Sequence, residues 1–253
     1  MSDRSTPLPR TGGHRRPAWH SATVVEVRPE IPHGARLILD VPSWPGNEAG
    51  THLDVRLTAS DGYQATRSYS VATSEPGRVV IGVDELPDGE VSPFLVNEVR
   101  AGDRLEIHGP LGSYFRWRPG QSTRPVQLIA GGSGVVPLYA MAAAHAAASD
   151  PSLFRLVYSV RTPAHAYFRD ELAALVGPSF AVDYVYTRQA PEGWAGQVGR
   201  LTKDALASVT FAPDERARVF VCGSTAFAET VVGWLLELGH GARDILTERF
   251  GGR

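Results

Sequence analysis

A glycine-rich turn between an expected strand and an expected helix is one place where this sequence can bind a ligand. The apolar run 127–130 leads into the turn 131–134, and Pro137 lies in the first turn of the helix that follows. Glycines lack Cβ atoms, so backbone N–H groups can approach a phosphate, which the helix N-terminus also attracts. The spacing is not G-x-G-x-x-G, and a nucleophile elbow would need glycine where Val135 stands. A tight connection that binds nothing is the alternative.

A second group of polar side chains is the tetrad Arg67-Ser68-Tyr69-Ser70, which lies within a run of β-forming residues. Alternation along a strand places Arg67 and Tyr69 on one face and the two serines on the other. Taken alone, the pattern is typical of a tyrosine packed at a sheet edge beside an arginine whose stem covers apolar surface.

Cys222 is the only cysteine among the 253 residues. This count excludes a disulfide within the chain, a cysteine-rich zinc site and an iron–sulfur cluster held by four thiolates of this chain. The eight histidines show no metal-ligand spacing, so no metal site is expected. Lys203 is the only lysine, and its surroundings are typical of a solvated helix. Any redox chemistry must therefore depend on something other than metal and thiolate groups.

Charge and hydropathy exclude two classes of partner. The formal charge of −2 results from 25 basic and 27 acidic residues, so no field attracts a nucleic acid. No stretch approaches the ~20 consecutive apolar residues that a membrane helix requires. Residues 1–19 are expected to form a disordered polar tail of a cytoplasmic protein.

The elements that position these residues fall into two groups. Short β-branched runs bounded by turn residues predict an N-terminal six-stranded antiparallel β-barrel with Greek-key connections and one short helix, 91–99. The strands are expected at 22–27, 35–41, 52–57, 66–71, 78–83 and 104–108. Beyond residue 123 strands and helices alternate, which predicts a C-terminal α/β domain with a five-stranded parallel sheet. Its strands are expected at 126–130, 154–160, 181–187, 218–222 and 244–247, and its helices at 137–148, 167–176, 202–208 and 226–238.

The order of several short motifs resembles one family, the ferredoxin–NADP⁺ reductase superfamily of flavoprotein reductases, in its two-domain form without a fused ferredoxin domain. The resemblance covers residues 20–252. The motifs are the tetrad 67–70, Gly89-Glu90-Val91-Ser92, the segment 109–115, the glycine turn, Tyr158-Ser159-Val160-Arg161 with Glu171-Leu172, Thr187-Arg188, Val221-Cys222-Gly223-Ser224 and Glu248-Arg249-Phe250-Gly251. It implies an FAD-binding barrel domain at 20–120 and an NAD(P)-binding α/β domain at 124–253.

On the flavin side, the resemblance implies roles for the tetrad and for the segment after residue 88. Arg67 is expected to pair with the flavin pyrophosphate, because its planar charged fork suits a phosphate. Tyr69 is expected to stack on the isoalloxazine, Ser70 to line the ring, and Ser68 to lie near flavin N5. The loop that binds the pyrophosphate is expected to consist of Gly89, Val91 and Ser92.

On the nicotinamide side, the resemblance implies that the glycine turn holds the dinucleotide. Ser133 would reach toward the ribose or the nicotinamide, and Cys222 would lie against nicotinamide C4 as a positioning contact. The expected catalytic residues are Ser68, Cys222 and Glu248. The remaining expected cofactor contacts are Gly132, Gly134, Pro137, Arg161, Thr187, Arg188, Gly223 and Phe250.

The resemblance implies an FAD-dependent NAD(P)H oxidoreductase of the ferredoxin reductase type. Hydride would pass from nicotinamide to flavin N5, and electrons to a separate acceptor, which is a ferredoxin, a flavodoxin, a partner oxidoreductase or a small molecule. The alternative is a flavin-binding, non-catalytic electron-transfer or interaction subunit. FMN in place of FAD stays open, and so does NADH, although the Thr187-Arg188 pair favours NADPH. We expect a monomer with no nucleic-acid or membrane partner.

Overall fold

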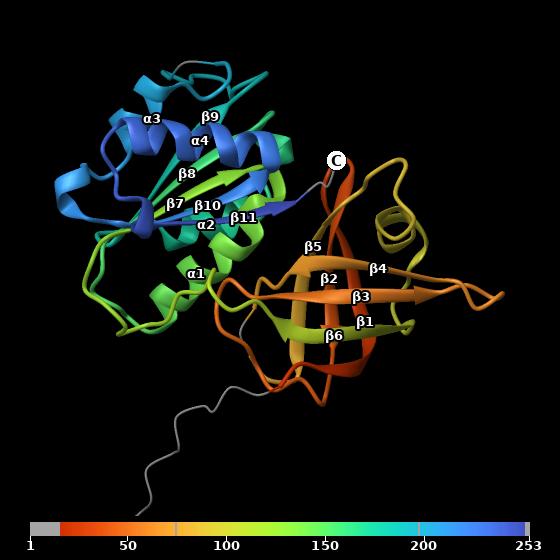
Figure 1. Ribbon diagram of the computed structural model, residues 1–253. Coiled ribbons are helices and arrows are strands. Elements are labelled where there is room, and N and C mark those ends of the chain that lie inside the picture. The colour runs from red at the N-terminus through yellow and green to blue at the C-terminus, as the bar shows by residue number, and fades with distance from the viewer. Residues whose placement is uncertain (1–15, 74, 197, 251–253) are drawn as a thin grey trace, which may run out of the picture.

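The computed structural model describes residues 16–73, 75–196 and 198–250, which form two packed domains (Figure 1). The first is a six-stranded antiparallel sheet with the strand order β4-β3-β6-β1-β2-β5. An antiparallel bridge between Val71 and Ile81 joins the end of β4 to β5 and closes the sheet into a barrel. Its strands are β1 (Ala18–Ile31), β2 (Gly34–Asp40), β3 (His52–Thr58), β4 (Gln64–Ser70), β5 (Arg78–Asp84) and β6 (Arg104–Leu111).

Apolar side chains of all six strands fill the barrel, as the β-branched runs predict. Leu37, Leu53, Ile81 and Ile107 are each fully buried in this core. The expected helix at 91–99 is a short π-helical turn, Phe94–Glu98, whose Leu95 is buried in the same core. β1 begins at Ala18, inside the range expected for the polar tail, while residues 1–15 lie outside the described residues.

The second domain has the expected five-stranded parallel sheet, in the order β11-β10-β7-β8-β9. Alternate residues of its strands enter two separate cores, so helices must cover both faces. Leu128 and Phe220 face α1 and α2, whereas Ile129 and Val221 face α3 and α4 (Figure 1). The elements are β7 (Val126–Gly131), α1 (Val135–Ala147), β8 (Phe154–Val160), α2 (Arg169–Leu175), β9 (Phe180–Tyr186), α3 (Lys203–Val209), β10 (Arg218–Ser224), α4 (Thr225–Glu237) and β11 (Ile245–Phe250).

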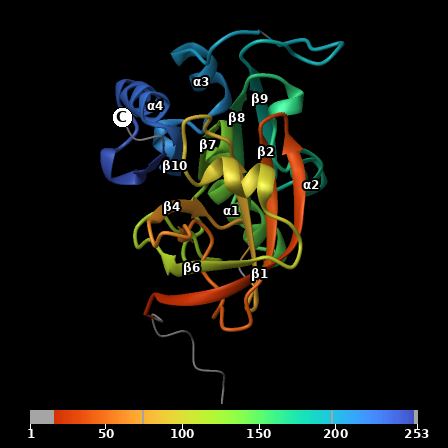
Figure 2. The same ribbon diagram turned by 90° about the vertical axis from the view of Figure 1, so that its right-hand side faces the viewer.

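The core on the α1 side of the sheet extends onto the outer face of the barrel at Ile38 of β2 and Val80 of β5, and α1 lies at the junction of the domains (Figure 2). Phe115, which follows the barrel, packs edge-on against Phe220 of β10, with 5.3 Å between ring centroids. A Cβ atom on Gly50 would lie 2.4 Å from Cε of Met141, so the barrel approaches α1 closely. The two domains therefore meet in an apolar interface that is separate from the core inside the barrel. Within the described residues, no helix has the length and apolar character needed to cross a membrane.

The glycine turn packs directly on the end of β10, which gives a first prediction. A Cβ atom on Gly134 would lie 2.2 Å from the carbonyl oxygen of Cys222 and 2.8 Å from the amide nitrogen of Gly223. Because both neighbours are backbone atoms, Gly134→Ala must displace the turn or the strand, and we expect it to destabilise the fold by about 1–3 kcal/mol.

The free energy of urea unfolding measures this loss, and Gly233→Ala is the matched control. A Cβ atom there meets nothing within 4 Å, and the residue lies inside α4. Alanine should therefore raise stability by up to about 1 kcal/mol, because glycine is a poor helix former. Equal unfolding free energies for the two variants would contradict the predicted close packing.

Candidate functional site

Residues from both domains meet where the carboxyl ends of β10 and β11 face the barrel. Cys222 of β10 is the register partner of Glu248 of β11. His52 Nδ1, at the start of β3, lies 3.3 Å from Oε1 of Glu248, and His52 is also the register partner of Ser70 of β4. We call these four residues the junction cluster. Open α/β sheets bind ligands at the carboxyl ends of their strands, which is where this cluster lies.

A hydrogen bond holds the barrel to β11 beside the junction cluster. Tyr114, in the segment that follows β6, donates from its hydroxyl to the carbonyl oxygen of Thr247 at 2.8 Å. Gly112 lies nearby, because a Cβ atom placed there would be 3.3 Å from Nδ1 of His52. The end of β6 and the last strand of the chain therefore fix the junction cluster from both sides.

The junction cluster has a defined charge state. Burial raises the pKa of the Cys222 thiol well above its usual value, and the Glu248 carboxylate adds to this rise. The neutral thiol form of Cys222 is therefore favoured, and the residue is a poor nucleophile. The Glu248 carboxylate, 3.3 Å from Nδ1, raises the pKa of His52, against a smaller opposing effect of burial. The imidazolium form of His52 is consequently favoured beside Glu248.

One buried carboxylate oxygen of the junction cluster has no hydrogen-bond partner. Oε2 of Glu248 makes no hydrogen bond with any of the described residues, whereas Nδ1 of His52 faces Oε1 of the same carboxylate at 3.3 Å as an ion pair. Buried polar atoms in native proteins are nearly always hydrogen-bonded, so atoms of this kind indicate a site for a polar group.

The structure does not bring Ser68 into the junction cluster. Its hydroxyl donates to the Asp54 carboxylate at 2.6 Å on the exposed face of the barrel. Ser68 and Ser70 share a face of β4, but two residues of strand separate them by about 7 Å. The register places Ser70, rather than Ser68, opposite His52.

A second group of expected residues gathers between the middle of β4 and the segment 89–92. Arg67 Nη2 donates to the Glu90 carboxylate at 3.1 Å, and the Tyr63 hydroxyl donates to the same carboxylate at 2.8 Å. Glu90 thus brings Arg67 to the segment 89–92. Ser92 accepts a hydrogen bond from the amide of Leu86 at 3.0 Å, so its own hydroxyl proton is available to another acceptor.

Neighbouring residues limit what this group can offer to a ligand. Val91 is fully buried in the barrel core, so only its backbone can contact a ligand. A Cβ atom on Gly89 would lie 3.0 Å from the carbonyl oxygen of Leu86, which keeps this turn tight. Tyr69 packs against the barrel core, and burial raises the pKa of its hydroxyl above the usual value.

The glycine turn opens onto a cavity of about 220 Å³ between the two domains. Gly132 and Ser133 line it on the sheet side together with Arg161 and His165, while His33 and Asp84 line it on the barrel side. Gly132 has a φ of +56°, a conformation that favours glycine, and a Cβ atom there would meet nothing within 4 Å. Gly134 and Pro137 are buried behind the turn. The turn therefore presents bare backbone to the cavity, as a phosphate-binding turn requires.

Basic groups collect beside this cavity. The amide of Arg188 donates to the carbonyl oxygen of Arg161 at 3.0 Å, and the amide of Thr187 to that of Val160 at 2.8 Å. The ends of β8 and β9 thus bring Arg161 and Arg188 side by side. Burial lowers the pKa of His165, and the charges of Arg161 and Arg188 lower it further. Two guanidinium groups in this position can bind a phosphate dianion.

Two of the expected cofactor contacts, Gly223 and Phe250, lie at the ends of β10 and β11. Gly223 packs so closely on α4 that a Cβ atom would lie 2.7 Å from Cδ1 of Phe227. Phe250 ends β11 opposite Ser224 with 37% of its surface exposed. The expected Gly251 and the two residues after it lie outside the described residues.

His52 and Tyr114 lie at the candidate site but are not among the residues expected there from the sequence. His52 had a local signal, since it opens the strand that pairs with the tetrad strand. Tyr114 lies in the segment 109–115 that contributed to the family resemblance, but its partner Thr247 is on a strand far along the chain. Neither contact can be seen without the packing of the two domains. Among the described residues, no group of histidine, cysteine and carboxylate side chains is arranged to hold a metal ion.

Comparison with known proteins identifies both domains. The Oxidoreductase FAD-binding domain family matches residues 36–116, and the Oxidoreductase NAD-binding domain family matches residues 128–233. The NADH-cytochrome b5 reductase 1 of Mycosarcoma maydis is 31% identical over 201 residues, which are 77% of this chain and 60% of that protein. The glycine betaine monooxygenase reductase subunit of Chromohalobacter salexigens is 31% identical over 198 residues, which are 76% of this chain and 53% of that protein.

A solved structure has the same fold over nearly the whole chain. The flavohem-like FAD/NAD-binding domain of the nitric oxide dioxygenase from Vibrio cholerae superposes with a TM-score of 0.82 at 24% identity. The superposition covers 92% of this chain and 99% of that one. By contrast, the chain spans only 60% and 53% of the two relatives compared by sequence.

The His52–Glu248 pair predicts a pH-dependent stability. Because Glu248 raises the pKa of folded His52, the pair stabilises the protein fully below the unfolded imidazole pKa of about 6.5. This contribution is lost as the pH rises through the higher folded value. We expect His52→Gln to lower the free energy of urea unfolding by about 1 kcal/mol near pH 6, and by less near pH 9.

Glu248→Gln is the matched partner variant, because it removes the carboxylate and leaves the imidazole. It should lose the same part of the pH dependence between pH 6 and 9 as His52→Gln. A Glu248→Gln protein with the pH profile of the unaltered chain would contradict the assignment of the raised pKa to this pair.

Proposed function

The chain belongs to the ferredoxin–NADP⁺ reductase superfamily of flavoprotein reductases, and we propose that it is an FAD-dependent NAD(P)H oxidoreductase that delivers electrons to a separate acceptor protein. The observation that carries the proposal is the junction cluster. There the barrel contributes His52 and Ser70, and the dinucleotide domain contributes Cys222 and Glu248. A reaction between two cofactors, each held by one domain, needs a meeting point of this kind.

The barrel residues suit FAD. Arg67 and the segment 89–92, which Glu90 brings together, offer a guanidinium, backbone amides and the Ser92 hydroxyl to a pyrophosphate. When a bound phosphate replaces the Glu90 carboxylate as the partner of Arg67, the guanidinium still has an anionic partner. FAD, when bound, supplies an acceptor for the hydride of the nicotinamide and then releases the two electrons singly or together.

The second domain suits NAD(P)H. The exposed backbone of Gly132 and Ser133 and the side chain of Arg161 line the cavity between the domains and can hold a diphosphate. Cys222 is a fully buried thiol at the end of β10 whose neutral form is favoured, so it does not compete as a nucleophile. The carboxylate of Glu248 favours the protonated form of His52, which faces it from the barrel.

The names of relatives support a protein as the acceptor. One relative is described as a reductase of cytochrome b5, and another as the reductase subunit of a monooxygenase. We therefore propose a partner oxidoreductase or a ferredoxin-like protein as the electron acceptor of this chain.

The visible spectrum of the purified protein tests the function directly. We expect a yellow protein whose flavin absorbance bleaches when NADPH or NADH is added without oxygen. A flavin that stays oxidised in this experiment would indicate a binding module without reductase activity. A colourless protein that does not take up FAD would refute the flavoprotein assignment.

Arg188 provides a test of cofactor choice. Its position beside Arg161 predicts that it binds the 2′-phosphate of NADPH. We expect Arg188→Ala to raise KM for NADPH by about tenfold, the equivalent of one charge-assisted hydrogen bond, and to change KM for NADH little.

Arg104→Ala, which removes an exposed arginine from β6 of the barrel, is the charge-matched control and should change neither constant. An unchanged ratio of the two KM values in Arg188→Ala would remove the assignment of Arg188 to the 2′-phosphate.

A further inference from the structure

The loop between β8 and α2, residues 161–168, extends from the dinucleotide domain to the barrel and ends in two buried aromatic residues. The Tyr167 hydroxyl lies 2.9 Å from the carbonyl oxygen of Val83 and 2.8 Å from Oδ1 of Asp84. A Cβ atom on Gly34 would lie 2.2 Å from this hydroxyl, so glycine is needed there for the close approach. Tyr167 is thus inserted into the edge of the barrel.

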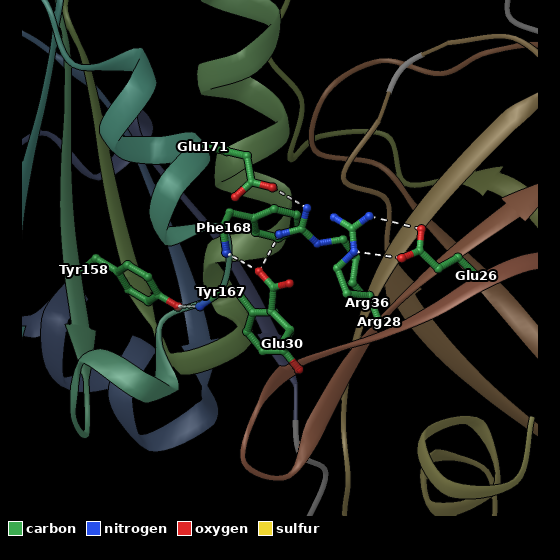
Figure 3. A network of polar contacts seen from close by, with 8 residues as sticks. All are labelled: Glu26, Arg28, Glu30, Arg36, Tyr158, Tyr167, Phe168 and Glu171. Atoms are coloured by element: carbon green, nitrogen blue, oxygen red, sulfur yellow. Dashed lines mark hydrogen bonds and ion pairs between the residues drawn. The ribbon is translucent and has the colours of Figure 1, made fainter.

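Phe168 is held still more tightly by groups from both domains (Figure 3). Its amide donates to Oε1 of Glu30 in β1 at 2.8 Å. The Arg36 guanidinium of β2 lies 4.2 Å from the centroid of the Phe168 ring, and Tyr139 of α1 stacks on the ring at 4.1 Å. The residue has a φ of +55°, which is unfavourable for phenylalanine and persists only where its surroundings enforce it.

Arg36 connects this contact to a second element of the dinucleotide domain. Its guanidinium donates to Glu30, in its own domain, and to Glu171 in α2, across the interface (Figure 3). Arg36 is only 8% exposed. Burial disfavours its charge, but the two carboxylates more than compensate and raise its pKa. A buried charge of this kind is costly to separate from its partners, so the interface has one favoured position.

The same loop forms part of the wall of the cavity at the glycine turn. Arg161 and His165 line that cavity from the loop, and Asp84, which accepts from Tyr167, lines it from the barrel. If Tyr167 and Phe168 shift on the barrel, Arg161 and His165 must therefore move relative to Asp84.

We propose that Arg36 is a positioning residue for hydride transfer. By pairing with Glu30 and Glu171 across the interface, it fixes the β8–α2 loop and with it the dinucleotide domain on the barrel. It touches neither of the proposed cofactor sites, and its effect is on how NAD(P)H is held against the flavin, not on whether FAD binds. This inference rests on the proposed function.

Glu171→Gln is the informative variant. The Glu171 side chain is 38% exposed, and its loss leaves Arg36 paired with Glu30 inside the barrel, so no buried charge is left without a partner. Of the contacts of Arg36, only its ion pair with Glu171 across the interface is removed. Glu26→Gln is the matched control, because the exposed Glu26–Arg28 pair lies within β1 of the barrel (Figure 3).

The first measurement is hydrogen exchange of the segments 34–40 and 167–172, which does not depend on activity. We expect exchange in Glu171→Gln to be about tenfold faster in both segments, as for loss of one charge-assisted hydrogen bond, and to be unchanged in Glu26→Gln. Arg36→Lys keeps the charge but loses the fork that spans two carboxylates, so it should change exchange in the same direction.

The second measurement separates binding from the hydride step. We expect Glu171→Gln to bind FAD in the same amount as the unaltered protein, to raise KM for NAD(P)H and to slow anaerobic flavin reduction by about tenfold or more. Glu171→Gln with the exchange and kinetics of Glu26→Gln would overturn the inference. Failure of the proposed function is distinct from this, since it would show as no flavin reduction in the unaltered protein.

Discussion

The apolar interface between α1 and the outer face of the barrel is the constraint on which the rest of this structure depends. Neither domain contains the candidate site alone, because the junction cluster combines residues of β3 and β4 with residues of β10 and β11. Apolar packing holds the domains together but has little directionality. The relative orientation of the two domains is set by a few polar contacts at the edges of the apolar interface. These are the hydrogen bond of the Tyr114 hydroxyl on one side and the Arg36 ion pairs on the other.

Burial at the interface also determines the chemistry that the site residues can perform. In water a thiol and an imidazole titrate near neutral pH, but at the junction their pKa values move in ways that suit positioning rather than nucleophilic attack. The Cys222 thiol is held neutral by burial, while the neighbouring Glu248 carboxylate favours the charged form of His52. One carboxylate thus acts in opposite ways on two groups, disfavouring an anion and favouring a cation.

Much of the fold could be predicted from local sequence patterns, whereas the site depends on contacts between distant segments. The strand expected at 154–160 is β8 (Phe154–Val160), because an apolar run buried on both faces leaves little ambiguity. β1 starts earlier than its apolar run because Trp19 and His20 pair with β6, and β11 extends to Phe250 because it pairs with β10. Alternation placed Ser68 and Ser70 on one face, but only the register with His52 distinguishes them.

The two domains give the cavity at the glycine turn walls of different charge. Its wall on the dinucleotide domain carries Arg161 and His165, whereas its wall on the barrel carries His33 together with the carboxylates of Asp84 and Glu85. A diphosphate is attracted to the first wall and repelled by the second, while hydroxyl groups find acceptors on the barrel side. On the proposed function, this charge difference would orient the phosphates of a dinucleotide toward the Arg161 side of the cavity. Because Tyr167 ties Asp84 to the loop that carries Arg161, this difference in charge is maintained only while the domains stay docked.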